Sequence, residues 1–264
     1  MQQLGIIGFG NMGEALVKGV RASGGGKTLL VAEKNQSRLE HAITTYGAED
    51  CTGDLSRLFT EAQVVILAIK PQDLEALAKN IKPVVGTTPV ISILAGKTLQ
   101  YIHDLTGAQE VARFMPSLAA QVQRSVVGVC YSEKSSEVFR ELSYQIANSL
   151  GLGVEVPERL MPAIIGTSGS GIAFAFAYLH AMALGGTKVG IPYDSSLEIA
   201  LDVMEGAIQT IRETKTQPVE LITKVCSPEG TTIEGILALE QGGFTPTIVD
   251  AVERAALRSS QLEQ

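Results

Sequence analysis

Near its N-terminus the chain reads Leu4-Gly5-Ile6-Ile7-Gly8-Phe9-Gly10-Asn11-Met12-Gly13, a short apolar run that ends in glycines just before a helical pattern begins. This is the G-x-G-x-x-G fingerprint in the strand, turn and helix setting of dinucleotide-binding domains. Gly8 permits the tight turn, Gly10 lets the backbone approach a pyrophosphate, and Gly13 lets the helix pack closely on the strand. The helix N-terminus would offer its N–H groups to the phosphates. The setting therefore favours a dinucleotide site over a glycine-rich turn of some other α/β domain.

Composition is that of an ordinary globular protein, with 45% hydrophobic and 19% charged residues. The formal net charge of −7 argues against a nucleic-acid surface. Cys51, Cys130 and Cys226 are far apart and odd in number, so we expect neither a disulfide framework nor a metal site. No positively charged segment precedes the first strand, so no signal peptide is expected. A reducing cytoplasm is the simplest location for such a chain.

Strands and helices alternate through the first half of the chain. This alternation predicts a twisted, mostly parallel sheet with helices on both faces. In such sheets ligands bind beyond the carboxyl ends of the strands, so Gly8–Gly13, Ala68–Pro71 and Met115–Pro116 should line one crevice. The predicted strands, after the first, are 28–32, 64–69, 89–94 and 110–114, with edge strands at 126–131 and 154–156; the predicted helices are 14–22, 37–46, one opened by 70–73, and 135–150.

From about residue 157 the strand signals stop. We therefore predict a dinucleotide-binding domain over residues 1–156 and a helical domain over residues 157–264. No Asp, Glu, Lys or Arg occurs between Arg159 and Lys188, a length that could span a bilayer, but Pro162 and several glycines interrupt it. We predict instead a buried helix whose apolar faces a subunit interface would cover. The predicted helices are 172–184, 193–214, 218–225, 231–241 and 245–262.

An acidic residue, Glu33, follows the second predicted strand about 20 residues beyond the glycines, where a carboxylate can hold the adenosine ribose of NAD. Lys34, Asn35 and Arg38 follow it and could instead accept the 2′-phosphate of NADP. A solvated strand end is the third interpretation of the same residues. The sequence therefore leaves the choice between NADH and NADPH open.

Several motifs occur together in one chain and in a fixed order. They are Ile7-Gly8-Phe9-Gly10-Asn11-Met12, Ala68-Ile69-Lys70-Pro71-Gln72, Met115-Pro116, Ser168-Gly169-Ser170-Gly171, Ser227-Pro228-Glu229-Gly230-Thr231-Thr232-Ile233, Gly243-Phe244, and Ala251-Val252 through Arg258-Ser259. In these motifs the chain resembles the pyrroline-5-carboxylate reductases over nearly its whole length. The resemblance implies an N-terminal Rossmann-type domain, and a C-terminal all-α domain for dimerisation and substrate binding. It also implies hydride transfer from NADPH or NADH to the C=N bond of Δ1-pyrroline-5-carboxylate, the step that forms L-proline.

The resemblance also implies roles for individual residues. The small cyclic imine acid would be bound by the Ser227–Thr232 loop, with Gly230 and Thr231 offering backbone N–H groups to its carboxylate. The Thr232 hydroxyl would lie near the ring nitrogen as the catalytic group, and Ser227 would support the loop. The C-terminal helices would pair two subunits, and the dimers would form larger rings. The implied cofactor-binding residues are Gly8, Phe9, Gly10, Asn11, Met12, Glu33, Lys34, Asn35, Ala68, Lys70, Pro71, Met115 and Pro116.

The same loop has a physical interpretation of its own. It precedes a predicted helix, so its N–H groups should be free to bind an anion. Ser-Pro-Glu is equally common as an ordinary helix start, and the loop by itself does not separate the two interpretations. No His, Asp or Glu stands out as a general acid. The reaction does not require one, because a cyclic imine is basic enough to bind in its protonated form.

Three positions depart from the family pattern: Ser117 replaces an Asn, Ile172 a Pro, and Glu229 a Gly. They leave open a divergent nucleotide-binding regulatory protein that has lost turnover. The β-hydroxyacid dehydrogenases are a second alternative, because Gly166–Gly171 matches their Gly-x-x-Gly-x-Gly spacing. Their catalytic lysine, however, would stand where this chain has Ala175.

Overall fold

A computed structural model describes residues 1–263 of the chain, which form two compact units. The first unit comprises Met1–Ser170 and the chain from Glu253 onward, and the second comprises Gly171–Val252. These units do not divide at the predicted residues 156 and 157. The segment after residue 157 stays with the first unit because Met161 is fully buried in its core.

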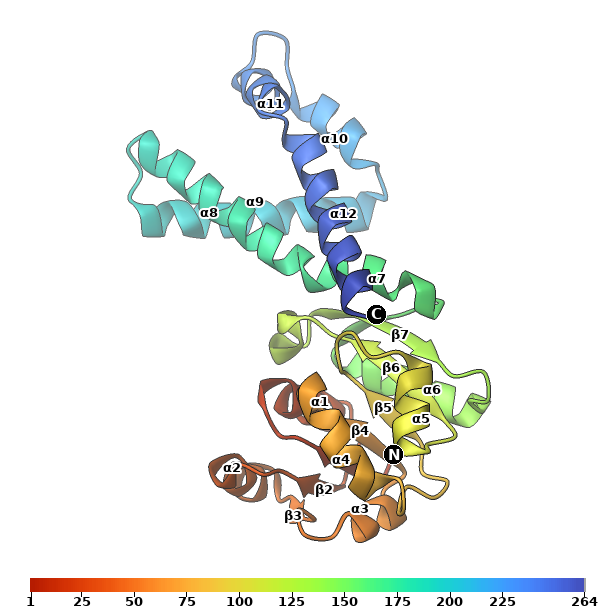
Figure 1. The fold of residues 1–264 in the computed structure, drawn as a ribbon. Coiled ribbons are helices and arrows are strands. Elements are labelled where there is room, and N and C mark those ends of the chain that lie inside the picture. Colours follow the sequence, from red (N-terminus) through yellow and green to blue (C-terminus); the bar gives the residue numbers. More distant parts are fainter. Residues whose placement is uncertain (264) are drawn as a thin grey trace. The chain divides into compact units, whose positions relative to one another are not determined.

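An eight-stranded sheet forms the centre of the first unit (Figure 1), with the strand order β3-β2-β1-β4-β5-β6-β7-β8. Neighbouring strands are parallel except for β6 and β7, which pair antiparallel. This confirms the predicted mostly parallel sheet. The strands are β1 (Gln3–Ile7), β2 (Thr28–Ala32), β3 (Glu49–Asp50), β4 (Val64–Leu67), β5 (Val90–Ser92), β6 (Val111–Met115), β7 (Ser125–Tyr131) and β8 (Gly151–Glu155).

Two hydrophobic cores lie on the two faces of this sheet, because successive side chains of a strand point to opposite faces. Ile6 belongs to one core and Ile7 to the other, and both are buried. This explains why the central strands are continuous apolar runs rather than alternating ones. The first core is completed by α1 (Asn11–Ala22), α2 (Gln36–Tyr46) and α6 (Glu137–Ser149), and the second by α3 (Leu55–Glu61), α4 (Leu74–Ile81), α5 (Leu99–Thr106) and α7 (Met161–Ile164).

Some elements differ from the sequence predictions. β3 and α3 were not predicted, since such short elements carry too few residues for a clear period. α5 was also not predicted, although Thr98 and Gly107 cap its two ends. β7 was expected at an edge but lies between β6 and β8, because long-range pairing decides strand order. The remaining short turns of the first unit are η1 (Pro71–Asp73), η2 (Leu118–Val122), η3 (Glu158–Leu160) and a π-helical turn, η4 (Ile165–Gly169).

After α7 and η4, the described residues form five longer helices. α8 (Gly171–Lys188) and α9 (Tyr193–Thr214) form a packed hairpin, whereas the second unit buries few of its apolar side chains. In the single chain Ala183 is the buried residue of α8, so the predicted burial of this helix depends on a second subunit. By length and composition, the segment Glu158–Lys188 could cross a membrane, and 17% of its apolar window is buried. The other helices are α10 (Pro218–Val225), α11 (Thr231–Gln241) and α12 (Phe244–Leu262), whose last residues belong to the first unit.

Candidate active site

The glycine turn joins the carboxyl ends of three strands. The Gly8 N–H donates to the Ala32 carbonyl at the end of β2 (2.9 Å), and the Ala68 N–H donates to the Ile7 carbonyl (2.8 Å). Gly8 has a φ of +95°, and a Cβ atom there would lie 2.6 Å from the Ala68 carbonyl oxygen. No residue other than glycine fits at this position. The hydrogen bond between Ala68 and Ile7 also shows that the glycine turn and the start of the Ala68–Pro71 segment meet as expected.

The first turn of α1 presents an open backbone cradle. Its N-cap is Gly10, which has no side chain to cap the helix, and a Cβ atom built on Gly10 would meet little besides an Arg38 nitrogen at 3.5 Å. Among residues 1–263, no acceptor contacts the N–H groups of Asn11 or Met12. A Cβ on Gly13 would lie 2.4 Å from the Gly8 carbonyl oxygen, so α1 packs as closely as the fingerprint requires. Free N–H groups at a helix N-terminus fit a dinucleotide pyrophosphate.

Glu33 turns its carboxylate toward the main chain. One oxygen accepts the Phe9 N–H at 2.6 Å and the other accepts the Asn35 N–H at 2.7 Å, and the residue is buried. The Phe9 ring is also buried and packs edge-on against Tyr46 of α2. Phe9 therefore lines the site with its backbone rather than with its ring, and the hydrogen bond to Glu33 holds that backbone in place.

Exposed cations surround the end of β2. Lys34 pairs with Asp73 of η1 at 3.1 Å, and Arg38 has no ion-pair partner in the described chain. Asn35 caps α2 by accepting the Arg38 N–H at 3.1 Å, which places Arg38 in the first turn beside Gly10. This end of the crevice therefore carries positive charge that an anionic group could use.

The end of β6 lies at the same edge of the sheet as the ends of β1, β4 and β5, because these strands are parallel. Met115 is buried and is followed by the half-buried Pro116 and the buried Ser117. The Ser117 N–H donates to the Ser125 hydroxyl at 2.8 Å, and the two hydroxyls are 3.1 Å apart. Ser117 thus joins β7 to the end of β6.

An open pocket of about 300 Å³ lies along the first turns of α1, and Gln121 of η2 also lines it. The Glu14 carboxylate on its wall accepts hydrogen bonds from His41 (2.7 Å) and from the Tyr46 hydroxyl (3.0 Å). The hydrogen bond to His41 is the largest of the effects that lower the pKa of Glu14 below its ordinary value. Glu14 is therefore a carboxylate at neutral pH and has no proton to give.

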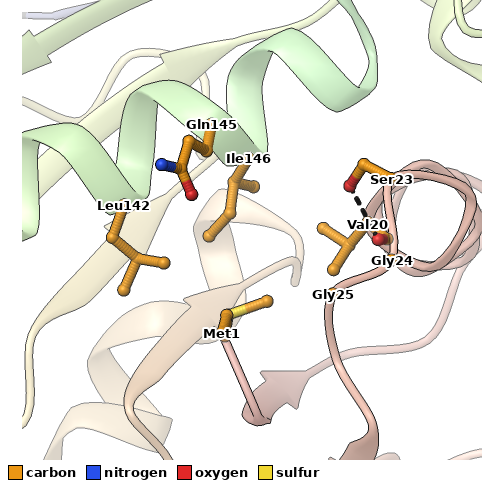
Figure 2. Close-up of a pocket in the computed structure, with 8 residues that line it drawn as sticks. All are labelled: Met1, Val20, Ser23, Gly24, Gly25, Leu142, Gln145 and Ile146. Atoms are coloured by element: carbon orange, nitrogen blue, oxygen red, sulfur yellow. Dashed lines mark hydrogen bonds between the residues drawn. The ribbon is translucent and has the colours of Figure 1, made fainter.

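A second cavity, of about 110 Å³, belongs elsewhere (Figure 2). It is lined by Met1 before β1, by Gly24 and Gly25 before β2, and by α6. These residues precede the strands, so the cavity lies at their amino ends, whereas the glycine turn lies at the carboxyl ends. We do not assign it to the site.

The loop before α11 is built as a tight turn. The Gly230 N–H donates to the Ser227 carbonyl at 3.0 Å, and a Cβ on Gly230 would lie 2.3 Å from the Ser227 hydroxyl oxygen. Glu229 takes a left-handed φ of +57°. Among residues 1–263, no acceptor contacts the N–H groups of Thr231 or Thr232, and no side chain caps α11. The loop thus has free donors for an anion, but the Gly230 N–H is already used within the turn.

Comparisons with known proteins agree over the whole chain. A family model described as pyrroline-5-carboxylate reductase dimerisation matches residues 158–262, and one described as NADP oxidoreductase, coenzyme F420-dependent, matches residues 3–96. A pyrroline-5-carboxylate reductase of Methanosarcina acetivorans is 35% identical, covering 99% of this chain and 98% of that protein. The Aquifex aeolicus reductase is 33% identical, covering 98% and 97%. The solved pyrroline-5-carboxylate reductase of Coxiella burnetii superposes with a TM-score of 0.92 at 26% identity, covering 100% and 99%.

Proposed function

The chain belongs to the pyrroline-5-carboxylate reductase family, and on this premise we propose how its residues carry out the reaction. It reduces the C=N bond of Δ1-pyrroline-5-carboxylate to L-proline with NAD(P)H. The similarity of the whole chain to these reductases is the observation that carries this function. It does not favour a β-hydroxyacid dehydrogenase or a regulatory protein without turnover.

A nicotinamide held in the site would supply the hydride for the imine carbon, and the residues of the chain supply position and charge. The N–H groups of Asn11 and Met12 hold the pyrophosphate, and Gly10 leaves room for it. The free N–H groups of Thr231 and Thr232 hold the substrate carboxylate. The Thr232 hydroxyl contacts the ring nitrogen, which arrives protonated and becomes the amine once the adjacent carbon accepts the hydride.

A Thr232→Ala variant tests this assignment. With synthetic Δ1-pyrroline-5-carboxylate and NADPH, followed by cofactor absorbance, we expect kcat to fall by roughly tenfold or more, since one hydrogen bond to a charged group is lost. Nucleotide affinity should stay unchanged. Thr60→Ala removes an exposed hydroxyl of α3 and is the matched control. Turnover of Thr232→Ala at the native rate would refute the role of Thr232, whereas a native chain without turnover would refute the function itself.

We propose that the chain prefers NADPH over NADH. Both oxygens of Glu33 already accept main-chain N–H groups, so the carboxylate is not poised to hold ribose hydroxyls. Arg38 is exposed beside Gly10, and Lys34 is exposed at the same strand end. Their cations are suited to a 2′-phosphate, which NADH lacks.

The preference is measured by kcat/KM with each cofactor. The native chain should favour NADPH, and Arg38→Ala with Lys34→Ala should lower kcat/KM for NADPH by roughly tenfold or more while that for NADH changes little. Lys79→Ala, on the exposed face of α4, is the control. Equal losses with both cofactors would contradict the 2′-phosphate role.

The dimerisation model match supports assembly of the chain as a homodimer or larger oligomer. We propose that the C-terminal helices form the dimer, and that the dimers assemble into a larger ring. We also propose a soluble enzyme of the cytoplasm, like other biosynthetic reductases of this kind. Light scattering after size-exclusion chromatography gives the number of subunits directly, and a monomeric active enzyme would contradict the first of these proposals.

A further inference from the structure

A buried guanidinium lies beneath the end of β6. The Arg113 side chain is 0% exposed and lies on the face of the sheet that also carries Val111 and Met115. It pairs with Glu158 of η3 at 3.4 Å and with Glu263, just beyond α12, at 2.5 Å. Within the described chain the Arg113 Nε has no hydrogen-bond partner. The two carboxylates are therefore what hold this charge in the core.

Arg113 thus pairs with both later parts of the first unit, the segment around Glu158 and the end of the chain after α12. Glu158 precedes the point where the chain leaves the first unit, and Glu263 follows the return of the chain along α12. A buried charge that loses one of its partners strongly destabilises the fold. Arg113 therefore strongly favours the arrangement in which both segments stay on the sheet.

The same contacts hold the loop between β5 and α5. The Glu158 carboxylate accepts the Leu99 N–H, the first of α5, at 2.7 Å. Gly96 in that loop has a φ of +70°, and a Cβ atom there would lie 2.7 Å from the Leu262 carbonyl oxygen. The loop follows the carboxyl end of β5, between the ends of β4 and β6. Glu33 and Lys34, after β2, mark the half of the sheet edge that binds the adenosine. In doubly wound sheets the other half, where the β5–α5 loop lies, binds the nicotinamide half of the dinucleotide.

We propose that Arg113 is a positioning residue for the nicotinamide end of the cofactor. Through Glu158 and Glu263 it sets the shape of the β5–α5 loop and of the Met115–Pro116 end of β6, and so the hydride donor's position. The inference rests on the proposed function. Because geometry errors of about 1 Å can cost about a hundredfold in rate, loosening these contacts should act on kcat.

Glu263→Gln tests the proposal with little change of shape, and Arg113→Lys keeps the positive charge. With Δ1-pyrroline-5-carboxylate and NADPH, we expect kcat to fall by about tenfold or more in both variants. The KM for NADPH should stay within about twofold, because the adenosine half is untouched. Amide hydrogen exchange should quicken in the β5–α5 loop, Leu99 included.

Arg140→Lys and Glu155→Gln alter an exposed ion pair of the same unit, at 3.3 Å, and are the matched controls. Circular dichroism and light scattering verify that each variant is folded and assembled. If Glu263→Gln and Arg113→Lys lose thermal stability but keep the native kcat and loop exchange, Arg113 is only structural and the inference fails. If the native chain has no turnover, the proposed function fails, which is a separate result.

Discussion

At the scale of single residues, Glu229 is the position where this chain differs most visibly from what its loop geometry favours. Its left-handed φ of +57° suits glycine, and a residue with a Cβ there costs roughly 1–2 kcal/mol. It is exposed, and it stands two residues before Thr231, which carries the first of the free N–H groups that we assign to the substrate carboxylate. Backbone strain and charge are two separate consequences of the same side chain.

Two substitutions separate these consequences. Glu229→Gly should relieve the strain and raise the free energy of unfolding by about 1 kcal/mol or less, since glycine also gains freedom in the unfolded chain. Glu229→Gln keeps the strain and removes the charge, so stability should not change. Both should lower the KM for Δ1-pyrroline-5-carboxylate, because a like charge near the substrate is removed. Steady-state kinetics and thermal unfolding measure the two effects. A KM unchanged in both variants would mean that the Glu229 carboxylate points to solvent.

At the scale of elements, the α8–α9 hairpin depends on the close approach of two small residues. A Cβ atom on Gly186 would lie 1.9 Å from the Ser196 hydroxyl oxygen and 2.9 Å from the Ser196 Cβ. Ser196 is buried, so its side chain has little room to move away. The glycine is needed here for space rather than for an unusual backbone angle.

Gly186→Ala should therefore lower the thermal midpoint of the second unit, with a loss of about 1–3 kcal/mol for overpacking. Ser196→Gly removes both clashing atoms, so the double variant should recover part of the loss. Gly185→Ala is the control, because a Cβ there meets nothing within 4 Å. Thermal unfolding by circular dichroism measures all four proteins. Equal midpoints for Gly185→Ala and Gly186→Ala would contradict the packing argument.

At the scale of the whole molecule, the second unit exposes many large apolar side chains, and exposed apolar patches mark interaction surfaces. Phe176 of α8 is 53% exposed, and Leu184 of the same helix is also exposed. A family model for dimerisation matches residues 158–262, which include these helices. A second subunit that covers them would bury the surface that the single chain leaves open.

Phe176→Lys should shift the protein toward monomers, because an unpaired charge would be buried at the proposed interface. Light scattering should show the lower mass, and turnover should fall with it if the site needs the assembled subunits. Val138→Lys on α6 is the matched control, since Val138 is 79% exposed on the first unit. An unchanged mass for Phe176→Lys would place the interface elsewhere.

Local patterns in the sequence were enough for the mostly parallel sheet, its glycine turn and five C-terminal helices. The apolar runs and the 3.6-residue periods indicate local backbone preference and burial. Gly8 indicates a tight turn that no other residue can form. Ala68 and Gly8 could be placed together because parallel strands end at the same edge. β3 and α3 were missed because their few residues carry little periodic signal, whereas α5 was missed although it is as long as the predicted α10.

Only the tertiary structure decided how the polar groups are used. Glu33 accepts main-chain N–H groups from Phe9 and Asn35, and the Gly230 N–H is engaged by Ser227. Arg113 meets Glu263, a residue 150 positions away. The sequence by itself determined which chemistry-bearing groups the chain carries and which elements they belong to. Their partners depend on contacts between distant segments, which no local pattern records.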